Sequence, residues 1–399
     1  MGVLKRNESN SKGRRNSVSI WLNLLFVCSL LLFVSTKNIT IMGEGFFIID
    51  KMESSLLTEG ERGKVLCAQD GFLYLYVTNS SQTVNLSDCL QVVDFRQPEN
   101  PIFAGRYEIA GSDYLVDFKI VDSTAYLLLQ DSYTGGIIWT ITLLNITEPA
   151  NPVLLGSSAA INTTSYRVDL SSWHLSIYQD YTYVSTDFEM LIFDCSNPAL
   201  PVKVANYSSS GGILHVKNDL LYLVSAGVKI FELIDPVNPM LIGEVNGTKH
   251  TPSASDLHGN YVITTFWWFG LRVYNCIDPY HPAIFWDYDF PDGGFDVYVT
   301  IRDMVIVNDK LFVGGYKLYI FDLSNPQKLK RPARINIGDR GISSLAVSES
   351  HVFLTIRGNI IIYSYVENFL ARNFFIGIGM GLSVVVGATK FIKWKKKKG

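Results

Sequence analysis

The chain has 399 residues, of which 48% are hydrophobic, so it can bury a large core as two ordinary domains or as one repeat architecture. A formal net charge of −3 and a pI of about 6.1 exclude the global basic field that is typical of nucleic-acid binding. The charge is uneven, because both ends are basic and the middle is acidic to neutral.

Residues 1–37 have the pattern of an export signal. Basic residues precede an apolar run from Ile20 to Val34, which has the length of a signal core and is short for a membrane span. The segment Val34-Ser35-Thr36 lacks the small-x-small pattern of a cleavage site. A cleaved signal peptide and an uncleaved signal anchor therefore both remain open.

A proline-containing motif recurs along the segment that follows. Each copy has an apolar strand that ends in an acidic or polar residue, a turn with proline, a second proline and another short apolar strand. The clearest copies cover residues 192–202 and 230–243. Proline cannot donate a hydrogen bond to a β-ladder, so it marks the turns between strands. The first prolines of successive copies are Pro98, Pro149, Pro198, Pro236, Pro279 and Pro326.

These prolines are 51, 49, 38, 43 and 47 residues apart, which is the length of one propeller blade. The last copy lacks its outer strand, which Phe46–Leu57 could supply, closing the ring. We predict an all-β chain with one β-propeller of seven four-stranded blades over residues 38–366; six or eight blades, or two sheet domains, remain open. Seven hairpins are expected, at residues 72–95, 125–147, 181–195, 220–233, 261–276, 311–323 and 352–365.

The motif resembles the LVIVD-repeat family of β-propellers. Its signature is an apolar strand ending in Asp, a Ser-Asn-Pro turn, a second proline and an apolar strand ending in Gly. Residues 193–198 and 321–326 match this signature well, whereas Asn145 and Asn275 stand where the signature has Asp. The resemblance covers nearly the whole segment between the two ends. It implies a propeller exposed at a prokaryotic cell surface, and it implies no catalytic residues.

The C-terminal end predicts a transmembrane helix at residues 367–389. Within it, the run from Phe369 to Thr389 is apolar, rich in glycine and interrupted by Arg372 alone. The lysine-rich tail at residues 390–399 is expected to be cytoplasmic, because positive residues stay on that side. Residues 38–366 are then extracytoplasmic, on a single-pass protein, or a two-pass protein if the N-terminal signal is uncleaved.

Sequons and cysteines lie in the same segment. Cys195 and Cys276 occupy equivalent repeat positions and are predicted to be buried core residues, and Cys67 and Cys89 could form a disulfide. No CxxC or histidine cluster accompanies them, so no zinc site is expected. The N-x-S/T sequons, which are typical of an exported segment, are at Asn38, Asn79, Asn85, Asn145, Asn162, Asn206 and Asn246.

The candidate binding residues lie in the fifth repeat. Two adjacent tryptophans in its B–C turn cannot both face one core if side chains alternate, so one could be exposed for sugar or protein binding. The alternative is that both wedge between blades. The following D–A loop is expected to begin near Trp286 and to lie on the same face. The candidate aromatic residues are Phe266, Trp267, Trp268, Phe269, Trp286 and Tyr288.

The same D–A loop carries alternate carboxylates, which with a glycine-permitted turn could surround Ca²⁺. The spacing lacks the closing glutamate of an EF-hand, and the alternative is a solvated loop. No other cofactor is expected. The candidate calcium ligands are Asp287, Asp289, Asp292 and Asp296.

No nucleophile, metalloprotease, P-loop or dinucleotide motif occurs in the sequence, and the six histidines are scattered over different repeats. We therefore expect a membrane-anchored, extracytoplasmic binding or scaffold protein that recognises a protein partner at the cell surface. One alternative is a lectin-like glycan- or Ca²⁺-dependent binder that uses the fifth-repeat loops. A hydrolase in the central channel is the other. No nucleic-acid partner is expected.

Overall fold

The computed structural model describes residues 40–41, 46–53, 56–57, 61–79, 88–97, 100–110, 113–133, 136–163, 173–208, 211–247, 252–266, 270–288, 301, 303–330, 332–337 and 341–367. Residues 52–362 form one compact unit, and residues 1–51 with 363–399 form a second. Within the described ranges, no helix is long and apolar enough to cross a membrane. The predicted export signal, the predicted span from residue 368 onward and the basic tail lie outside these ranges.

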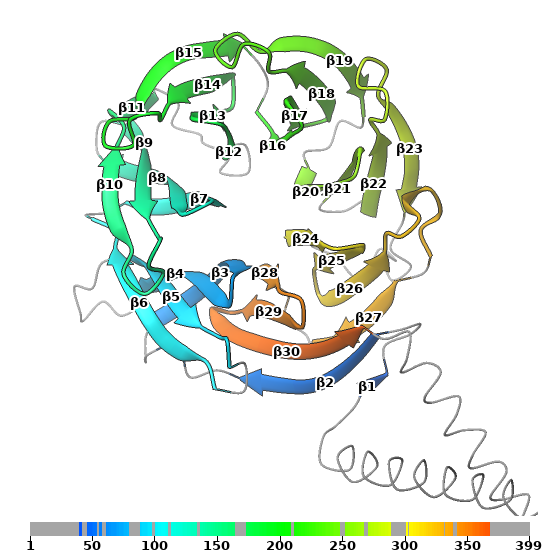
Figure 1. Ribbon diagram of the computed structural model, residues 1–399. Helices are drawn as coiled ribbons and strands as arrows, with labels where there is room; N and C mark the ends of the chain where they lie inside the picture. The colour runs from blue at the N-terminus through cyan, green and yellow to red at the C-terminus, as the bar shows by residue number, and fades with distance from the viewer. Residues whose placement is uncertain are drawn as a thin grey trace, which may run out of the picture. The chain divides into compact units, whose positions relative to one another are not determined.

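The chain is a seven-bladed β-propeller with four antiparallel strands in each blade, as predicted (Figure 1). Blades 1–7 are numbered from β3 onward, and their strands are lettered A to D from the centre of the ring outward. The seven predicted hairpins are confirmed as the B–C pairs of these blades.

The strands fall into four concentric sets. The A strands are β3 (Glu61–Gln69), β7 (Tyr114–Val121), β12 (His174–Tyr178), β16 (Ile213–Lys217), β20 (Pro252–His258), β24 (Asp303–Val307) and β28 (Ser344–Val347). The B strands are β4 (Phe72–Asn79), β8 (Thr124–Tyr133), β13 (Tyr181–Ser185), β17 (Leu220–Val224), β21 (Tyr261–Phe266), β25 (Lys310–Gly314) and β29 (His351–Ile356). The C strands are β5 (Cys89–Asp94), β9 (Gly136–Asn145), β14 (Glu189–Asp194), β18 (Gly227–Glu232), β22 (Gly270–Asn275), β26 (Lys317–Asp322) and β30 (Asn359–Glu367). The D strands are β6 (Ile102–Glu108), β10 (Val153–Ser157), β15 (Val202–Ser208), β19 (Met240–Asn246), β23 (Ala283–Tyr288), β27 (Ala333–Asn336) and, in the seventh sheet, β2 (Phe46–Glu53).

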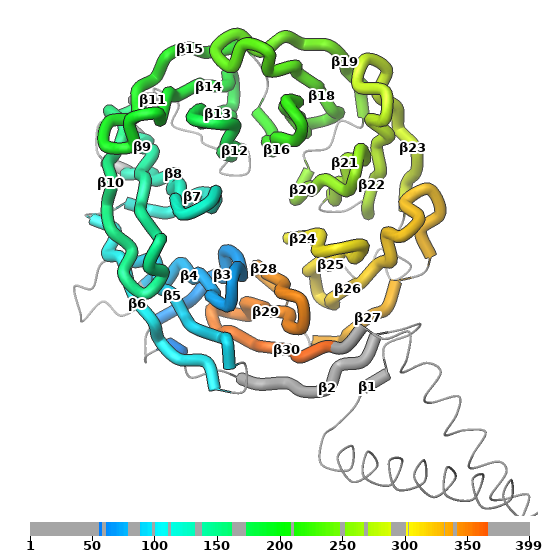
Figure 2. Tube along the Cα trace, in the orientation of Figure 1, coloured from blue at the N-terminus to red at the C-terminus, as the bar shows by residue number. Residues whose placement is uncertain are grey.

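Three short elements complete the described structure: β1 (Thr40–Ile41) pairs with β2, β11 (Ile161–Thr163) pairs with β9, and a 3₁₀ helix η2 covers Pro326–Lys328. The position of β2 beside β30 confirms that the N-terminal stretch supplies the outer strand of the last blade. Blades 7 and 1 also meet near the centre, where the Val65 N–H donates to Thr355 Oγ1 at 2.9 Å. Figure 2 shows β3 next to β28 at this seam.

The A–B turns hold two residues in most blades, and their first residue takes a left-handed conformation. Asn, Asp and Gly adopt this conformation most readily, which explains the Asn/Asp/Gly turns of the sequence. The left-handed residues are Asp70, Asp122, Gln179, Asn218 and Asn308, with φ between 49° and 53°, and Gly259 with φ 58°.

The polar residue that ends the C strand caps the C–D turn in most blades. In five blades its side-chain oxygen accepts a hydrogen bond of 2.8–3.0 Å from the backbone N–H two residues on. Asp and Asn both supply this oxygen, so the Asn copies of the repeat fold in the same way. The donor and acceptor pairs are Arg96 and Asp94, Thr147 and Asn145, Ser196 and Asp194, Ile277 and Asn275, and Ser324 and Asp322.

The glycine that follows the second proline of the repeat lies where neighbouring blades touch. An added Cβ would overlap a backbone carbonyl oxygen in the C–D turn of the next blade, so no larger residue fits without displacement. The touching pairs are Gly105 with Ala150, Gly156 with Ala199, and Gly243 with Pro279.

The possible disulfide between Cys67 and Cys89 is absent, since both thiols are free. Cys67 pairs with Tyr74 and Cys89 with Val77, on strands that lie on opposite sides of β4. Two strand spacings and three residues of rise separate their Cα atoms by about 14 Å, whereas a disulfide needs less than about 7 Å. Cys195 and Cys276 are buried, which confirms their predicted place in the core.

Candidate functional site

The candidate aromatic residues of the fifth blade that the structure describes pack against the core. Phe266 ends β21 and is buried, and Trp286 and Tyr288 lie in the outer strand β23, so placing Phe266 in a turn and the other two in a loop was wrong. The Trp286 and Tyr288 rings stack at 5.3 Å, and Tyr288 meets Phe321 of blade 6 edge-on at 5.2 Å. Trp267, Trp268 and Phe269 lie outside the described residues.

Trp286 stands where blades 1, 2 and 4 have glycine. It pairs with Val273 in β22, just as Gly243 pairs with Ile230 in β18. The next C–D turn, in blade 6, contains the 3₁₀ helix η2 in place of the usual turn. A large side chain thus occupies the boundary between blades 5 and 6, and Trp286 joins the hydrophobic cluster there.

The candidate calcium loop is described at Asp287 alone; Asp289, Asp292 and Asp296 lie outside the described residues. The Asp287 carboxylate accepts two hydrogen bonds from the Arg272 guanidinium, at 2.5 and 2.7 Å. Arg272 is itself nearly buried and lies over the Phe266 ring. Within the described residues, no group of three His, Cys, Asp or Glu side chains could hold a metal ion.

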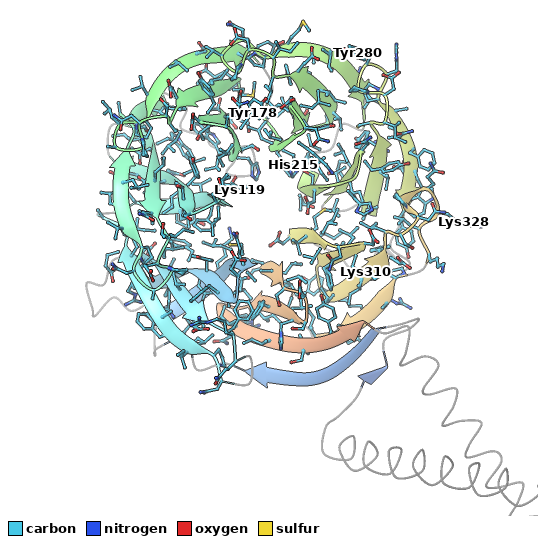
Figure 3. The ribbon with its side chains drawn as sticks, viewed as in Figure 1. Lys119, Tyr178, His215, Tyr280, Lys310 and Lys328 are labelled. Atoms are coloured by element: carbon cyan, nitrogen blue, oxygen red, sulfur yellow. The ribbon has the colours of Figure 1, made fainter. Side chains whose placement is uncertain are left out.

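The central channel is a polar cavity of about 470 Å³. Side chains from all seven blades line it, and Lys119 and His215 lie at the inner edge of the ring (Figure 3). The lysine, aspartate and histidine residues that line it are Lys64, Asp117, Lys119, His174, His215, Asp256 and Asp303.

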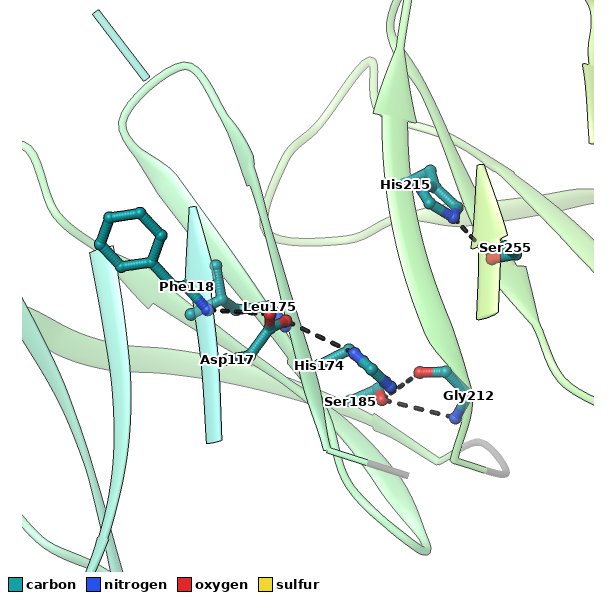
Figure 4. A network of polar contacts seen from close by, with 8 residues as sticks. All are labelled: Asp117, Phe118, His174, Leu175, Ser185, Gly212, His215 and Ser255. Carbon is teal, nitrogen blue, oxygen red and sulfur yellow. Dashed lines mark hydrogen bonds and ion pairs between the residues drawn. The ribbon is translucent and has the colours of Figure 1, made fainter. Parts of the chain in front are cut away.

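The channel aspartates join neighbouring blades. Each accepts a hydrogen bond from the N–H of the following residue and a second from the A strand of the next blade, and Figure 4 shows this arrangement at Asp117 with the adjacent His174. His215 and Ser255 join blades 4 and 5 in a similar way, at 2.7 Å. The carboxylates therefore act as fixed acceptors between strands. The inter-blade bonds link Asp117 to Leu175 (2.9 Å), Asp256 to Ile306 (2.8 Å) and Asp303 to Leu345 (2.9 Å).

Burial and neighbouring charge shift the pKa values in the channel. Burial raises the pKa of Asp303 to about 6, although the Leu345 N–H and Lys64 oppose it. At Asp117 burial acts in the same direction, but Lys119, His174 and the backbone outweigh it, and the pKa falls below its usual range. Burial, followed by the charge of Lys119, lowers the pKa of His215 to about 3. His215 is thus neutral at physiological pH.

A second cavity, of about 950 Å³, opens on the face of the ring where the B–C and D–A turns lie. We call this face the upper face and this cavity the basic pocket. The pocket adjoins the channel, because Lys64 and Ser343 line both. Three cationic side chains and no carboxylate line it among the described residues. The side chains that line it are Arg62, Lys64, Tyr76, Thr78, Tyr114, Tyr316, Ser343, Thr355, Arg357 and Asn359.

The seam between blades 7 and 1 fixes the two arginines of the pocket. The B–C turn of blade 7 consists of Arg357 and Gly358, both with positive φ. The Gly358 carbonyl accepts a 2.9 Å hydrogen bond from the Gly63 N–H, directly after Arg62. An added Cβ on Gly358 would stand 2.7 Å from Arg62 Cβ, so the contact needs glycine. Arg62 and Arg357 are thereby held close together.

Neither arginine was identified from the sequence. The two belong to opposite ends of the propeller segment, and the strands that carry them meet only when the ring closes. A weak signal was present: Arg62 and Lys64 alternate on a strand, which places them on one side of it. Their partners across the ladder are Thr78 and Tyr76, which also line the pocket.

Three of the predicted glycosylation sites have exposed side chains, namely Asn145, Asn206 and Asn246. The Asn145 side-chain oxygen accepts from Thr147, and the Asn206 amide donates to Glu189 at 2.6 Å. The side chains of Asn79 and Asn162, and all of Asn38 and Asn85, lie outside the described set. Modification of these residues stays a prediction.

Comparison with known proteins supports the fold and the repeat. Residues 171–209, most of blade 3, match the family model of the LVIVD repeat, which confirms the resemblance found in the sequence. The comparison with curated proteins finds no match.

Solved structures of similar fold share little sequence with the chain. The computationally designed Ika8 protein is similar at a TM-score of 0.52 and 11% identity, over 79% of this chain and 100% of that one. A chain of the Mitotic Checkpoint Complex is similar at 0.54 and 12%, over 83% and 94%. Raptor from Chaetomium thermophilum is similar at 0.54 and 11%, over 84% of this chain and 30% of that one. At such identities the likeness shows the fold alone.

Proposed function

Since the chain is a seven-bladed propeller with an LVIVD repeat, we propose that it is a membrane-anchored, extracytoplasmic binding protein. Its ligand, a protein or a glycan of the cell surface, binds on the upper face at the basic pocket. The observation that carries this proposal is the pocket itself: about 950 Å³, with Arg62, Lys64, Arg357 and two exposed tyrosines converging on it. Turns on a rigid scaffold are where binding residues concentrate.

The exposed tyrosines provide the test. Tyr114 and Tyr316 line the basic pocket, with 42% and 38% of their surface exposed. A tyrosine that a bound ligand buries contributes strongly to the binding free energy, so replacement of either by alanine should weaken binding roughly tenfold. Full-length protein in mild detergent is offered a solubilised envelope fraction, and the captured component is quantified for the wild type, Tyr114→Ala and Tyr316→Ala.

Tyr280→Ala is the matched control. Tyr280 is 55% exposed and lies in the C–D turn of blade 5, on the opposite face, which we call the lower face. Its loss should leave capture unchanged. If Tyr280→Ala abolishes capture and the pocket variants do not, the binding face has been misplaced.

Catalysis in the channel is a second candidate, because the pKa of Asp303, raised to about 6, suits proton transfer. Against it, the three channel aspartates already accept inter-blade backbone hydrogen bonds. Turnover of glycoside or ester substrates that disappears in Lys119→Gln would favour catalysis over binding.

A further inference from the structure

We infer that the basic pocket takes an acidic sugar, with its carboxylate or sulfate between Arg62 and Arg357 and its ring against a tyrosine. This inference rests on the proposed function and names the ligand class of the same site. Four features of the pocket carry it: its charge, the absence of competing carboxylates, its exposed rings and its hydroxyl groups.

The first feature is positive charge that no carboxylate among the described lining residues offsets. The hydrogen bond between Gly63 and Gly358 keeps Arg62 and Arg357 side by side at the seam, and Lys64 follows two residues later on the same strand. Like charges that line one cavity repel each other, so an anion between them is stabilising. Guanidinium groups bind carboxylate and sulfate oxygens through paired, charge-assisted hydrogen bonds.

The second feature is that neighbouring carboxylates have other partners. Glu61, next to Arg62, forms an ion pair with Arg106 at 2.6 Å. Asp88 accepts a short hydrogen bond from the hydroxyl of Tyr76. Within the described residues, neither acid lines the cavity. The pocket therefore keeps its positive potential for a ligand.

The third feature is a pair of exposed rings on opposite sides of the seam. Tyr114 comes from blade 2 and Tyr316 from the B–C turn of blade 6. Tyr76 meets Tyr114 edge-on, at 5.6 Å and 87°, and holds that ring in place. An immobile, half-exposed aromatic ring offers an apolar face to the C–H side of a sugar and a hydroxyl to its edge.

The fourth feature, the hydroxyl and amide groups of the lining, favours a sugar over an acidic peptide as the ligand. Thr78, Ser343 and Asn359 add hydroxyl and amide groups to the lining, which match the many hydroxyls of a sugar. One recurring mode of peptide recognition adds an extended peptide to the exposed edge of a sheet. Here the cavity lies among turns and inner strands, away from the outer D strands. Its volume suits a short oligosaccharide.

The test is a titration of the full-length protein in mild detergent by isothermal calorimetry. The probes are a galacturonate tetrasaccharide, a chondroitin sulfate tetrasaccharide, neutral maltotetraose and hexaglutamate. We expect at least one acidic tetrasaccharide to bind at least tenfold more tightly than maltotetraose and hexaglutamate. Binding should weaken as salt is raised from 50 to 500 mM, because ions screen the pocket charge.

Two pairs of variants assign the binding to the pocket. The double variant Arg62→Gln/Arg357→Gln should bind the acidic sugar at least tenfold more weakly. Arg357→Lys keeps the charge but loses the paired donors, so its affinity should lie between those of the double variant and the wild type. The matched control Lys203→Gln/Lys328→Gln removes two exposed charges elsewhere and should change affinity less than twofold. Urea unfolding checks that each variant is folded; if the double variant is not, Arg357→Lys alone decides.

Four results would overturn the inference: maltotetraose binding as tightly as the acidic sugars, hexaglutamate doing so, unchanged affinity in the arginine variants, or no binding of either acidic sugar. If no acidic sugar binds while envelope capture still depends on Tyr114 and Tyr316, only the ligand class is wrong. If that capture also fails, the proposed function is wrong as well.

Discussion

Single glycines in the outer strands set the distance between neighbouring blades. The glycine at the end of the repeat signature lies against the backbone of the next C–D turn, where no side chain fits. The glycine that ends the repeat signature is thus required by the packing of one blade against the next. The sequence predicted the position of this glycine but not its neighbour, because the contact partner belongs to the next repeat.

We predict that Gly243→Ala lowers the free energy of unfolding by about 1–3 kcal/mol, the usual cost of overpacking a close contact. The added methyl group would overlap the Pro279 carbonyl oxygen and press on the Pro282 ring. Urea unfolding of the full-length protein measures the change. Gly341→Ala is the control, since the nearest atom to an added Cβ there is 3.7 Å away, and equal losses in both variants would contradict this explanation.

At the same scale, Asp303 makes stability depend on pH. Burial raises its pKa from 3.8 to about 6, so the folded chain holds this proton more tightly than the unfolded chain. The contribution of this proton to the free energy of unfolding is complete below pH 3.8 and disappears as the pH rises through 6. A shift of roughly two units corresponds to about 3 kcal/mol.

Asp303→Asn should therefore gain stability relative to the wild type between pH 4 and pH 7, by up to about 3 kcal/mol. Urea unfolding of both proteins at four pH values in this range gives the difference. His215, whose lowered pKa acts in the opposite direction, is present in both proteins and cancels. A difference that does not change with pH would show that Asp303 is not buried as a raised-pKa acid.

At the scale of the element, the repeat could be predicted from the sequence because its polar residues form hydrogen bonds with their near neighbours in the chain. The Asp or Asn that ends a C strand caps the turn two residues on, so both the strand and its turn leave a mark in the sequence. The fifth blade was misread because its contacts with the next blade leave no such local mark. Trp286 and Tyr288 lie in the outer strand β23, and nothing in the local sequence shows that they pack against blade 6.

At the scale of the whole molecule, the candidate site exists only because the ring closes. The bond between Val65 and Thr355 joins residues that are 290 positions apart, and the basic pocket lies at this seam. Spacing and composition predict the number of blades and the outer strand β2, since these follow from the period. They do not predict which turns of the first and last blades meet.

The central claim is that the ligand binds on the upper face, at the basic pocket. The most direct measurement is photo-crosslinking in intact cells, with p-benzoylphenylalanine in place of Tyr114 or Tyr316 on the upper face, and of Tyr178 or Tyr280 on the lower face. The account predicts a crosslinked cell-surface component from the two upper positions and none from the two lower ones. Crosslinks from Tyr178 or Tyr280 alone would contradict it.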